Sequence, residues 1–199
     1  MKVLIACEES QIVTKAFRER GHEAYSCDIL PCSSGHPEWH IQQDVIAILA
    51  NYWDLLIAHP PCTYLSYVGN IWFKDKYKDR FPNRLEQRDK AIVFFLEFVN
   101  AKVNKIAIEN PVGVMNSIYR KPDQVISPHQ FGHDFSKRTC LWLKNLPKIT
   151  PTNIISSPLP FQTWELHNGA MVSMTPKERS TFRSKTAQGI ANAMAEQWG

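Results

Sequence analysis

The chain has 199 residues, of which 44% are hydrophobic and 21% charged, and its net charge is +4. These values are typical of one globular domain and exclude a disordered or low-complexity chain. The sequence has no apolar run of about 18 residues that would cross a bilayer. Its first ten residues are too acidic for a signal peptide, so we expect a cytoplasmic protein whose five cysteines are reduced.

Strand and helix patterns alternate along the first half of the chain. Short apolar runs predict strands, and apolar residues at helical spacing predict helices. The expected order is a strand at 3–7, a helix at 10–20 that is capped by Ser10 and ended by Gly21, a strand at 23–29, a short helix at 44–50, a strand at 54–58, a long helix at 85–101 and a strand at 105–108. This alternation predicts an α/β fold with a mostly parallel sheet and helices on both faces.

The second half has a different character. Residues 124–131 and 139–143 are predicted strands that can pair as a hairpin, and 186–198 is a predicted final helix. Residues 144–178 are rich in Pro, Ser, Thr and Asn and are expected to be mostly loop. A second long loop, 64–84, carries six aromatic and five basic residues. It is either a functional lid that stacks on bases and meets phosphates, or an ordinary solvated loop with aromatic residues packed beneath it.

Polar residues gather at the predicted carboxyl ends of the strands, where α/β sheets bind ligands. They are Glu8, Glu9, Ser10, Asp28, Asp44, Cys62 and Glu109. An acid after the second strand suits the hydroxyls of a ribose. The first turn, CEESQ, is acidic and has no glycine, so it suits a positively charged nucleoside without phosphates, such as S-adenosylmethionine. The alternative is that Glu8 and Glu9 only cap the first helix.

Cys62 follows a predicted buried strand and two prolines. The prolines stiffen the backbone and remove two donors, so the thiol is expected to project on a rigid support. Such a thiol suits a nucleophile. The alternative is that Cys62 is a small buried hydrophobic residue.

The motif Pro60-Pro61-Cys62, followed by Glu109-Asn110 after the next strand, resembles the carbon-5 cytosine-specific DNA methyltransferase family. In that family a Pro-Pro-Cys motif carries the nucleophile and a Glu-Asn-Val motif carries the acid. Other stretches are similar to family motifs in the same order: 3–10, Asp28, Asp44, 131–138 and 188–193. The resemblance implies a Rossmann-like S-adenosylmethionine-dependent methyltransferase fold, with a single catalytic domain over 1–199.

The resemblance also implies roles for individual residues. Cys62 would add to carbon 6 of the cytosine, and Glu109 would bond to ring nitrogen 3, either protonated or sharing a proton. Burial is expected to raise the pKa of Glu109 for that role. Arg138 would hold the ring carbonyl or a phosphate. The implied residues for binding S-adenosylmethionine are Cys7, Glu8, Glu9, Ser10, Asp28, Ile29, Asp44, Val45, Pro60 and Asn192.

The sequence departs from the family pattern in three places. The first motif lacks glycine, Pro111 replaces the valine of Glu-Asn-Val, and Cys140 stands where a second arginine is expected. Residues 144–178 are also too few for the family's large target-recognition domain. The substrate is therefore DNA, duplex or single-stranded, or a free pyrimidine nucleotide. The second class of function that fits the sequence is a nucleic-acid-binding relative that does not catalyse methyl transfer.

Two further groups of residues could serve as a zinc site or as catalytic bases. Cys27, Cys32, His36 and His40 have spacing within reach of a zinc site. However, Cys27 lies inside a predicted strand, so we expect no metal there. The three histidines His59, His129 and His133 are candidate bases, although a hydrogen-bonded structural histidine is the commoner case.

Overall fold

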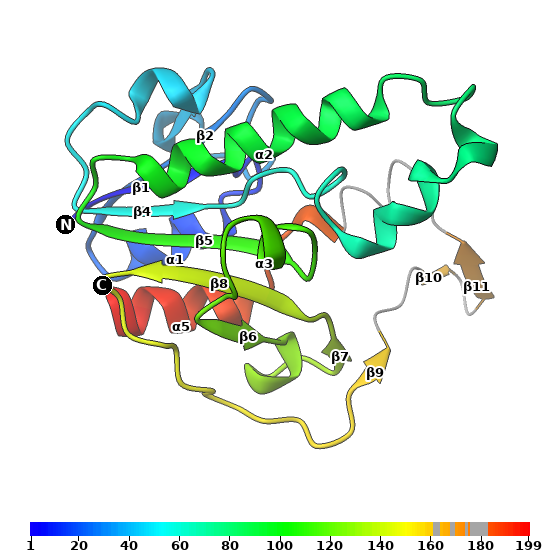
Figure 1. Cartoon of the computed structure of the whole chain (residues 1–199). Coiled ribbons are helices and arrows are strands. Elements are labelled where there is room, and N and C mark those ends of the chain that lie inside the picture. Colours follow the sequence, from blue (N-terminus) through cyan, green and yellow to red (C-terminus); the bar gives the residue numbers. More distant parts are fainter. Residues whose placement is uncertain (161–163, 168–169, 174, 176–182) are drawn as a thin grey trace.

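The computed structural model describes residues 1–160, 164–167, 170–173, 175 and 183–199 (Figure 1). Its centre is a seven-stranded sheet in the order β3-β2-β1-β4-β5-β8-β6. The strands are β1 (Lys2–Ala6), β2 (Glu23–Asp28), β3 (His40–Gln42), β4 (Leu55–Ala58), β5 (Lys105–Pro111), β6 (Gln124–Ile126) and β8 (Thr139–Lys144). Strands β3, β2, β1, β4 and β5 pair in parallel, and β8 is antiparallel to β5 and β6. The predicted α/β fold with a mostly parallel sheet is confirmed.

Helices cover both faces of this sheet (Figure 1). Helix α1 (Ile12–Glu19) packs against α5 (Gln188–Trp198) on one face, and α2 (Arg84–Asn100) covers the other. A short helix, α3 (Met115–Ile118), follows β5. Shorter 3-10 helices lie at Pro37–Trp39, Val45–Ile48, Tyr67–Phe73, Asp75–Tyr77 and Pro128–Gln130. No helix in these described ranges is long and apolar enough to cross a membrane.

The two hydrophobic cores follow from the alternation of side chains along each strand. In β1, Val3 and Ile5 join the core beneath α1 and α5, which includes Phe17 and Trp198. Leu4 and Ala6 join the core beneath α2, which includes Phe95, Phe98 and Trp142. Strands β4 and β5 divide their residues in the same way. This double burial explains why the sequence shows continuous apolar runs here.

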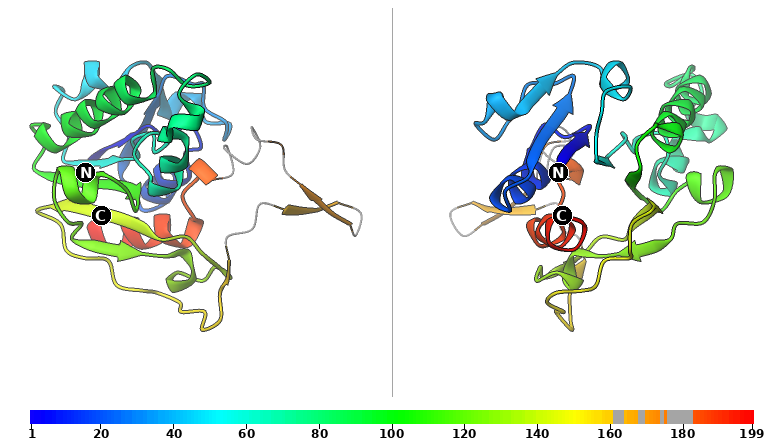
Figure 2. Two further views of the ribbon diagram at one scale, coloured as in Figure 1. Left: turned by 45° about the vertical axis from the view of Figure 1, so that its right-hand side comes forward. Right: turned by 90° about the vertical axis from the view of Figure 1, so that its left-hand side faces the viewer.

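The region that was expected to be loop, 144–178, contains short strands. Strand β9 (Leu159–Pro160) pairs in parallel with β7 (Phe135–Ser136). Strands β10 (Trp164–His167) and β11 (Ala170–Ser173) form an antiparallel hairpin. The hairpin lies apart from the main sheet in the left view of Figure 2. Part of the 144–178 region falls outside the described residues.

Several predicted boundaries differ from the structure. Strand β5 continues to Pro111, because residues Glu109 to Pro111 pair with β8. The predicted strand 124–131 ends at Ile126, since Pro128 begins a 3-10 helix. The antiparallel pairing of this segment with 139–143 is confirmed. Strand β3 has only three residues, too few for a sequence pattern.

The start of α1 shows that Ser10 is not the predicted cap. Gln11 occupies the N-cap position with a left-handed backbone and no side-chain cap. The buried carboxylate of Glu8 instead accepts hydrogen bonds from the backbone N–H groups of Val13 (2.6 Å) and Thr14 (3.2 Å). It also accepts one from the Thr14 hydroxyl at 2.7 Å. Both oxygens of Glu8 are thus engaged by the helix, as the capping alternative proposed.

Replacing Glu8 with alanine is expected to reduce the free energy of unfolding by about 1–3 kcal/mol, because two N–H groups and a hydroxyl lose their acceptor in a buried site. Burial raises the pKa of Glu8, so part of this stabilisation is offset by the cost of desolvating its charge. Urea denaturation would measure the loss. Glu9→Ala is the matched control, and an equal loss in both variants would contradict the capping role.

Candidate functional site

The turn after β1 brings together three residues that were predicted to bind the cofactor. Burial raises the pKa of the Cys7 thiol, and the nearby charges of Asp28 and Asp44 raise it further. The Cys7 backbone N–H donates to the carbonyl of Cys27 in β2 at 2.7 Å. Cys7, Asp28 and Asp44 therefore lie at one edge of the sheet and form an acidic patch beyond β1 and β2.

This turn adopts glycine-type backbone conformations without glycine. Cys7 has φ 59° and Gln11 has φ 54°, both in the left-handed region that side chains other than glycine rarely enter. The missing glycines of the first motif thus do not prevent the turn from forming. The turn instead depends on contacts made by the side chain of Gln11, which is fully buried.

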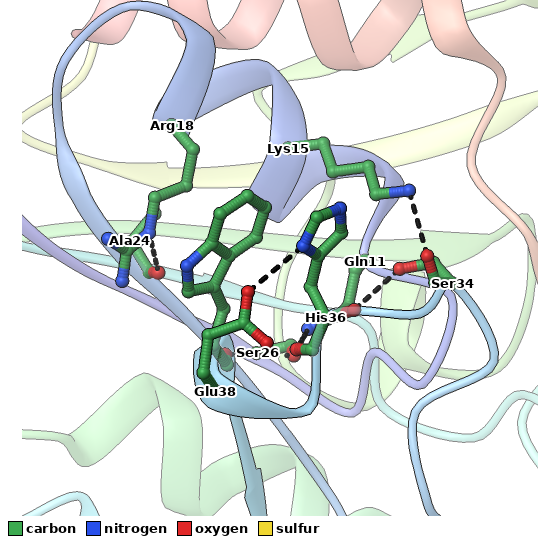
Figure 3. A network of polar contacts seen from close by, with 9 residues as sticks. Gln11, Lys15, Arg18, Ala24, Ser26, Ser34, His36 and Glu38 are labelled. Carbon is green, nitrogen blue, oxygen red and sulfur yellow. Dashed lines mark hydrogen bonds and ion pairs between the residues drawn. The ribbon is translucent and has the colours of Figure 1, made fainter.

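Gln11 fastens the segment that follows β2 to the start of α1 (Figure 3). Its Nε2 donates to the carbonyl of His36 at 2.8 Å and to the Ser26 hydroxyl at 3.2 Å. Its Oε1 accepts a hydrogen bond from the hydroxyl of Ser34, whose carbonyl accepts from Lys15 Nζ at 3.1 Å. These contacts hold the segment beside the acidic patch and explain how a non-glycine residue is kept in a left-handed conformation.

The remaining predicted cofactor residues are less closely grouped. Ile29 is 72% exposed next to Asp28. The residues Glu8, Ser10, Val45 and Pro60 are buried, and Glu9 is partly buried. Asn192 lies exposed on α5 and accepts a hydrogen bond from Gln188 at 2.8 Å. The cofactor role of each of these residues stays a prediction.

The alternative zinc site finds no support in the arrangement of its four residues. Both ring nitrogens of His40 already have partners, the Ser26 hydroxyl at 2.8 Å and the Leu30 carbonyl at 2.9 Å. His36 pairs with Glu38 at 3.0 Å. Within the described ranges, which include all four residues, no three His, Cys, Asp or Glu side chains could hold a metal ion.

The loop that carries Cys62 is fastened on one side to the end of β5 and on the other side to the segment that follows β5. Asn110 donates from Nδ2 to the carbonyl of Pro60 at 2.6 Å. Beyond the cysteine, the Leu65 carbonyl accepts from the Val114 N–H at 2.8 Å. Cys62 itself is exposed. These hydrogen bonds tie the loop that carries the thiol to the neighbouring chain on both sides, and the stiffening by the two prolines stays a prediction.

Three charged groups act on the Cys62 thiol. Although the residue as a whole is exposed, the surrounding protein shields its sulfur atom from water, and this desolvation raises the pKa of the thiol. The charge of Glu109 raises the pKa further. Lys137 and Arg183 act in the opposite direction, but the net pKa stays above the ordinary value of 9.0. Cys62 is therefore protonated at neutral pH, and a nucleophilic role requires a group that accepts its proton.

The cation beside Glu109 and Cys62 is Lys137 rather than its neighbour Arg138. The charge of Lys137 acts on both Glu109 and Cys62, whereas Arg138 is exposed and acts on Cys140 in β8. Lys137 Nζ also donates to the carbonyl of Arg183 at 2.7 Å. Sequence reasoning named Arg138 because it matched a family motif, and it missed Lys137. The role of Arg138 stays a prediction.

Glu109 forms a buried pair with a histidine that sequence reasoning considered only as a candidate base. His59 Nδ1 lies 2.9 Å from Glu109 Oε2. Burial acts to raise the pKa of Glu109, but the hydrogen bond and charge of His59, together with Lys137, outweigh it and lower the pKa. The expected rise in this pKa is therefore wrong in direction, because the expectation considered burial without the partner.

A pocket of about 260 Å³ opens beside this pair. The end of β5, the segment before β8 and the starts of α1 and α5 meet around it. Its apolar side includes Ile12, Ala187 and Ile190, and its polar side includes Glu109, Lys137, Thr139 and Lys185. An apolar wall with a few convergent polar groups is the usual design of a small-ligand site.

The segment 64–84 lies beyond the carboxyl end of β4 (Figure 1). Its aromatic side chains partly pack among themselves, with Trp72 4.9 Å from Tyr77 between ring centroids. The guanidinium of Arg88 in α2 lies 3.4 Å from the ring centroid of Phe73. The basic side chains on its outer surface are exposed: Lys74, Lys76, Lys78 and Arg80. The packing agrees with the solvated-loop alternative, and contact with nucleic acid stays a prediction.

Alkylation of Cys62 by iodoacetamide is expected to have a pH midpoint above 9.0, since burial and Glu109 disfavour the thiolate. A raised pKa leaves little thiolate at neutral pH, so the rate should increase only as the pH approaches that midpoint. Glu109→Gln should lower the midpoint and Lys137→Met should raise it. Peptide mass spectrometry would follow Cys62, with Cys32 as an internal comparison. A midpoint that neither substitution changes would contradict this electrostatic environment.

Comparisons with known proteins support the fold. No family model matches the sequence, and no curated protein matches it. Among solved structures, the chain is similar to a protein named "putative DNA modification methyltransferase", encoded within an E. coli prophage. The TM-score is 0.51 and the identity 14%, over 77% of this chain and 51% of that one. This chain thus spans about half the length of that structure.

At this level of identity the likeness concerns the fold alone. The strand order, with β8 antiparallel between β5 and β6, resembles that of a Rossmann-like methyltransferase. The predicted fold class is therefore confirmed.

Proposed function

We propose that this chain is an S-adenosylmethionine-dependent methyltransferase that adds a methyl group to carbon 5 of cytosine in DNA through a Cys62 adduct. The main observation is that Cys62, Glu109 and Lys137 come together at the carboxyl edge of the sheet. The methyltransferase-like fold and the Pro-Pro-Cys motif add support. Membership of the carbon-5 cytosine family, with one catalytic domain over 1–199, is part of the proposal.

The acidic patch fits the cofactor that the fold implies. Asp28 and Asp44 would present carboxylates to a ribose and a positively charged group, beside the Cys7 thiol. When bound, S-adenosylmethionine supplies a methyl group as a sulfonium. The other proposed cofactor residues are those predicted from the sequence.

The chain's own residues then provide the remaining chemistry. The Cys62 proton passes to ionised Glu109 as the sulfur bonds to carbon 6, and Glu109 passes that proton to ring nitrogen 3. Carbon 5 becomes nucleophilic and receives the methyl group. Loss of the carbon-5 proton to a base then expels the sulfur as a thiolate and restores the aromatic ring. The nitrogen-3 proton returns through Glu109 to the sulfur, which restores both the thiol and the ionised carboxylate. Lys137 would stabilise the negative charge that develops at this site.

Two other functions remain as alternatives. The short 144–178 region favours a free pyrimidine nucleotide over a DNA target that is read in detail. A non-catalytic nucleic-acid binder would keep the fold without the transfer. The exposed basic residues of segment 64–84 suit a polyanion such as DNA, both for the proposed DNA methyltransferase and for the non-catalytic binder.

The test is methyl transfer from labelled S-adenosylmethionine to duplex DNA, single-stranded DNA and dCMP. We expect label in DNA with the wild type, none with Cys62→Ser, and normal labelling with Cys32→Ser as the control. DNA that contains 5-fluorocytosine should form a stable adduct with the wild type, because the carbon-5 proton that must leave is replaced by fluorine. Label in dCMP alone would show that the substrate is a free nucleotide rather than DNA. No label with any substrate would contradict the proposed methyltransferase activity.

A further inference from the structure

His59 is a buried group beside the proposed nucleophile that the chemistry above leaves without a role. Its backbone N–H donates to the Ala6 carbonyl at 2.9 Å, which ties the end of β4 to β1. Its ring points toward β5 and the carboxylate of Glu109. The side chains of His59 and Glu109 are only 8% and 14% exposed. His59 thus precedes Cys62 closely in the sequence, and its shielded ring has Glu109 as its hydrogen-bond partner.

The hydrogen bond fixes how the pair is arranged. An ionised carboxylate only accepts hydrogen bonds, so His59 Nδ1 must carry the hydrogen. The other ring nitrogen, Nε2, is buried and has no hydrogen-bond partner in the part of the chain that the structure describes. Oε2 of Glu109 is then occupied by His59, and Oε1 remains for the pocket.

We propose that His59 is a positioning residue that keeps Glu109 ionised and in one orientation, ready to accept the proton of Cys62. This inference rests on the proposed function. Its physical basis is that burial favours the neutral form of Glu109, whereas the hydrogen bond from His59 favours the ionised form, and a neutral carboxyl group cannot act as the acceptor. The other titratable groups that act on this pair are Glu8 after β1, Cys62 after β4, Lys137 before β8 and Cys140 in β8.

Two substitutions at His59 separate positioning from packing. In His59→Asn the amide nitrogen takes the place of Nδ1 and can donate to Glu109, but it does not titrate. In His59→Leu the volume is largely kept, but the donor is lost. His22→Asn is the matched control, because His22 lies at the opposite end of the sheet, just before β2. Thermal melting would establish that all three variants fold.

The readout is the pH dependence of Cys62 alkylation, because the charge of Glu109 acts on this thiol. In His59→Leu, Glu109 should become neutral at higher pH than in the wild type, so Cys62 alkylation at pH 7 should be several-fold faster. His59→Asn and His22→Asn should keep the wild-type profile. An unchanged profile in His59→Leu, or equal shifts in His59→Leu and His59→Asn, would overturn the proposal.

Methyl transfer gives the second readout. His59→Leu should reduce kcat by about 10- to 100-fold with little change in KM for DNA, and His59→Asn should lose less. A loss confined to KM, or equal losses in the two variants, would also overturn the positioning role. The alkylation experiment needs no substrate, so a wild-type protein that transfers no methyl group would contradict the proposed function alone.

Discussion

Glu109→Gln is expected to reduce methyl transfer by about 10²- to 10⁴-fold, the usual contribution of a general acid–base group. The amide keeps the size of the side chain but cannot accept the Cys62 proton or pass it to a ring nitrogen. His59 would also lose the charged acceptor that it contacts at 2.9 Å. Single-turnover rates with labelled cofactor would measure the effect on the chemical step.

The same substitution should make Cys62 more acidic while slowing methyl transfer. Glu109 raises the pKa of Cys62, so its removal increases the thiolate fraction at neutral pH. If thiolate formation alone limited the reaction, Glu109→Gln would therefore be faster than the wild type. A faster reaction would contradict the proton-transfer role of Glu109. Glu97→Gln, on α2, is the control and should keep the wild-type rate.

The fold could be predicted from the sequence because most of its information is local. Continuous apolar runs such as 54–58 are buried on both faces, which indicates a parallel sheet. Helical spacing identified α1, α2 and α5. The errors fall where long-range contacts decide. Ser10 has the usual chemistry of a cap, but Glu8 takes this role because the left-handed Gln11 turns the chain. Nothing in the local pattern distinguishes these two outcomes.

The site was predicted in part for the same reason. Cys62 follows β4, and Glu109 lies near the end of β5. These strands are adjacent in the sheet, so the topology places the two residues together. The His59–Glu109 pair depends on ring orientation, and the choice of Lys137 over Arg138 depends on which way each side chain points before β8. Neighbouring residues in extended chain point in opposite directions, so an error of one position reverses the result. His59 could have been found from its position directly before the Pro-Pro-Cys motif.

Gly113→Ala is expected to damage both stability and activity, because this position lies against the Cys62 loop. A Cβ atom at Gly113 would lie 2.1 Å from the backbone carbonyl oxygen of Leu65. That oxygen accepts the hydrogen bond from Val114, and Ser66 forms a β-bridge with Gly113. The contact is with backbone, so a side-chain rotation cannot relieve it. The loop after Cys62 must move away from β5, at a cost of about 2–3 kcal/mol in the free energy of unfolding.

The effect on catalysis should exceed the effect on folding. A displacement of about 1 Å in a catalytic group can reduce the rate by about 100-fold. Gly21→Ala is the control, because Gly21 has φ 80° but nothing lies within 4 Å of the methyl group that alanine would add, so it measures backbone strain without a clash. Denaturation and methyl transfer would be measured on both variants. A folded Gly113→Ala protein with wild-type transfer would show that the rigid support of Cys62 is unnecessary, and the purpose assigned to its two prolines would then be wrong.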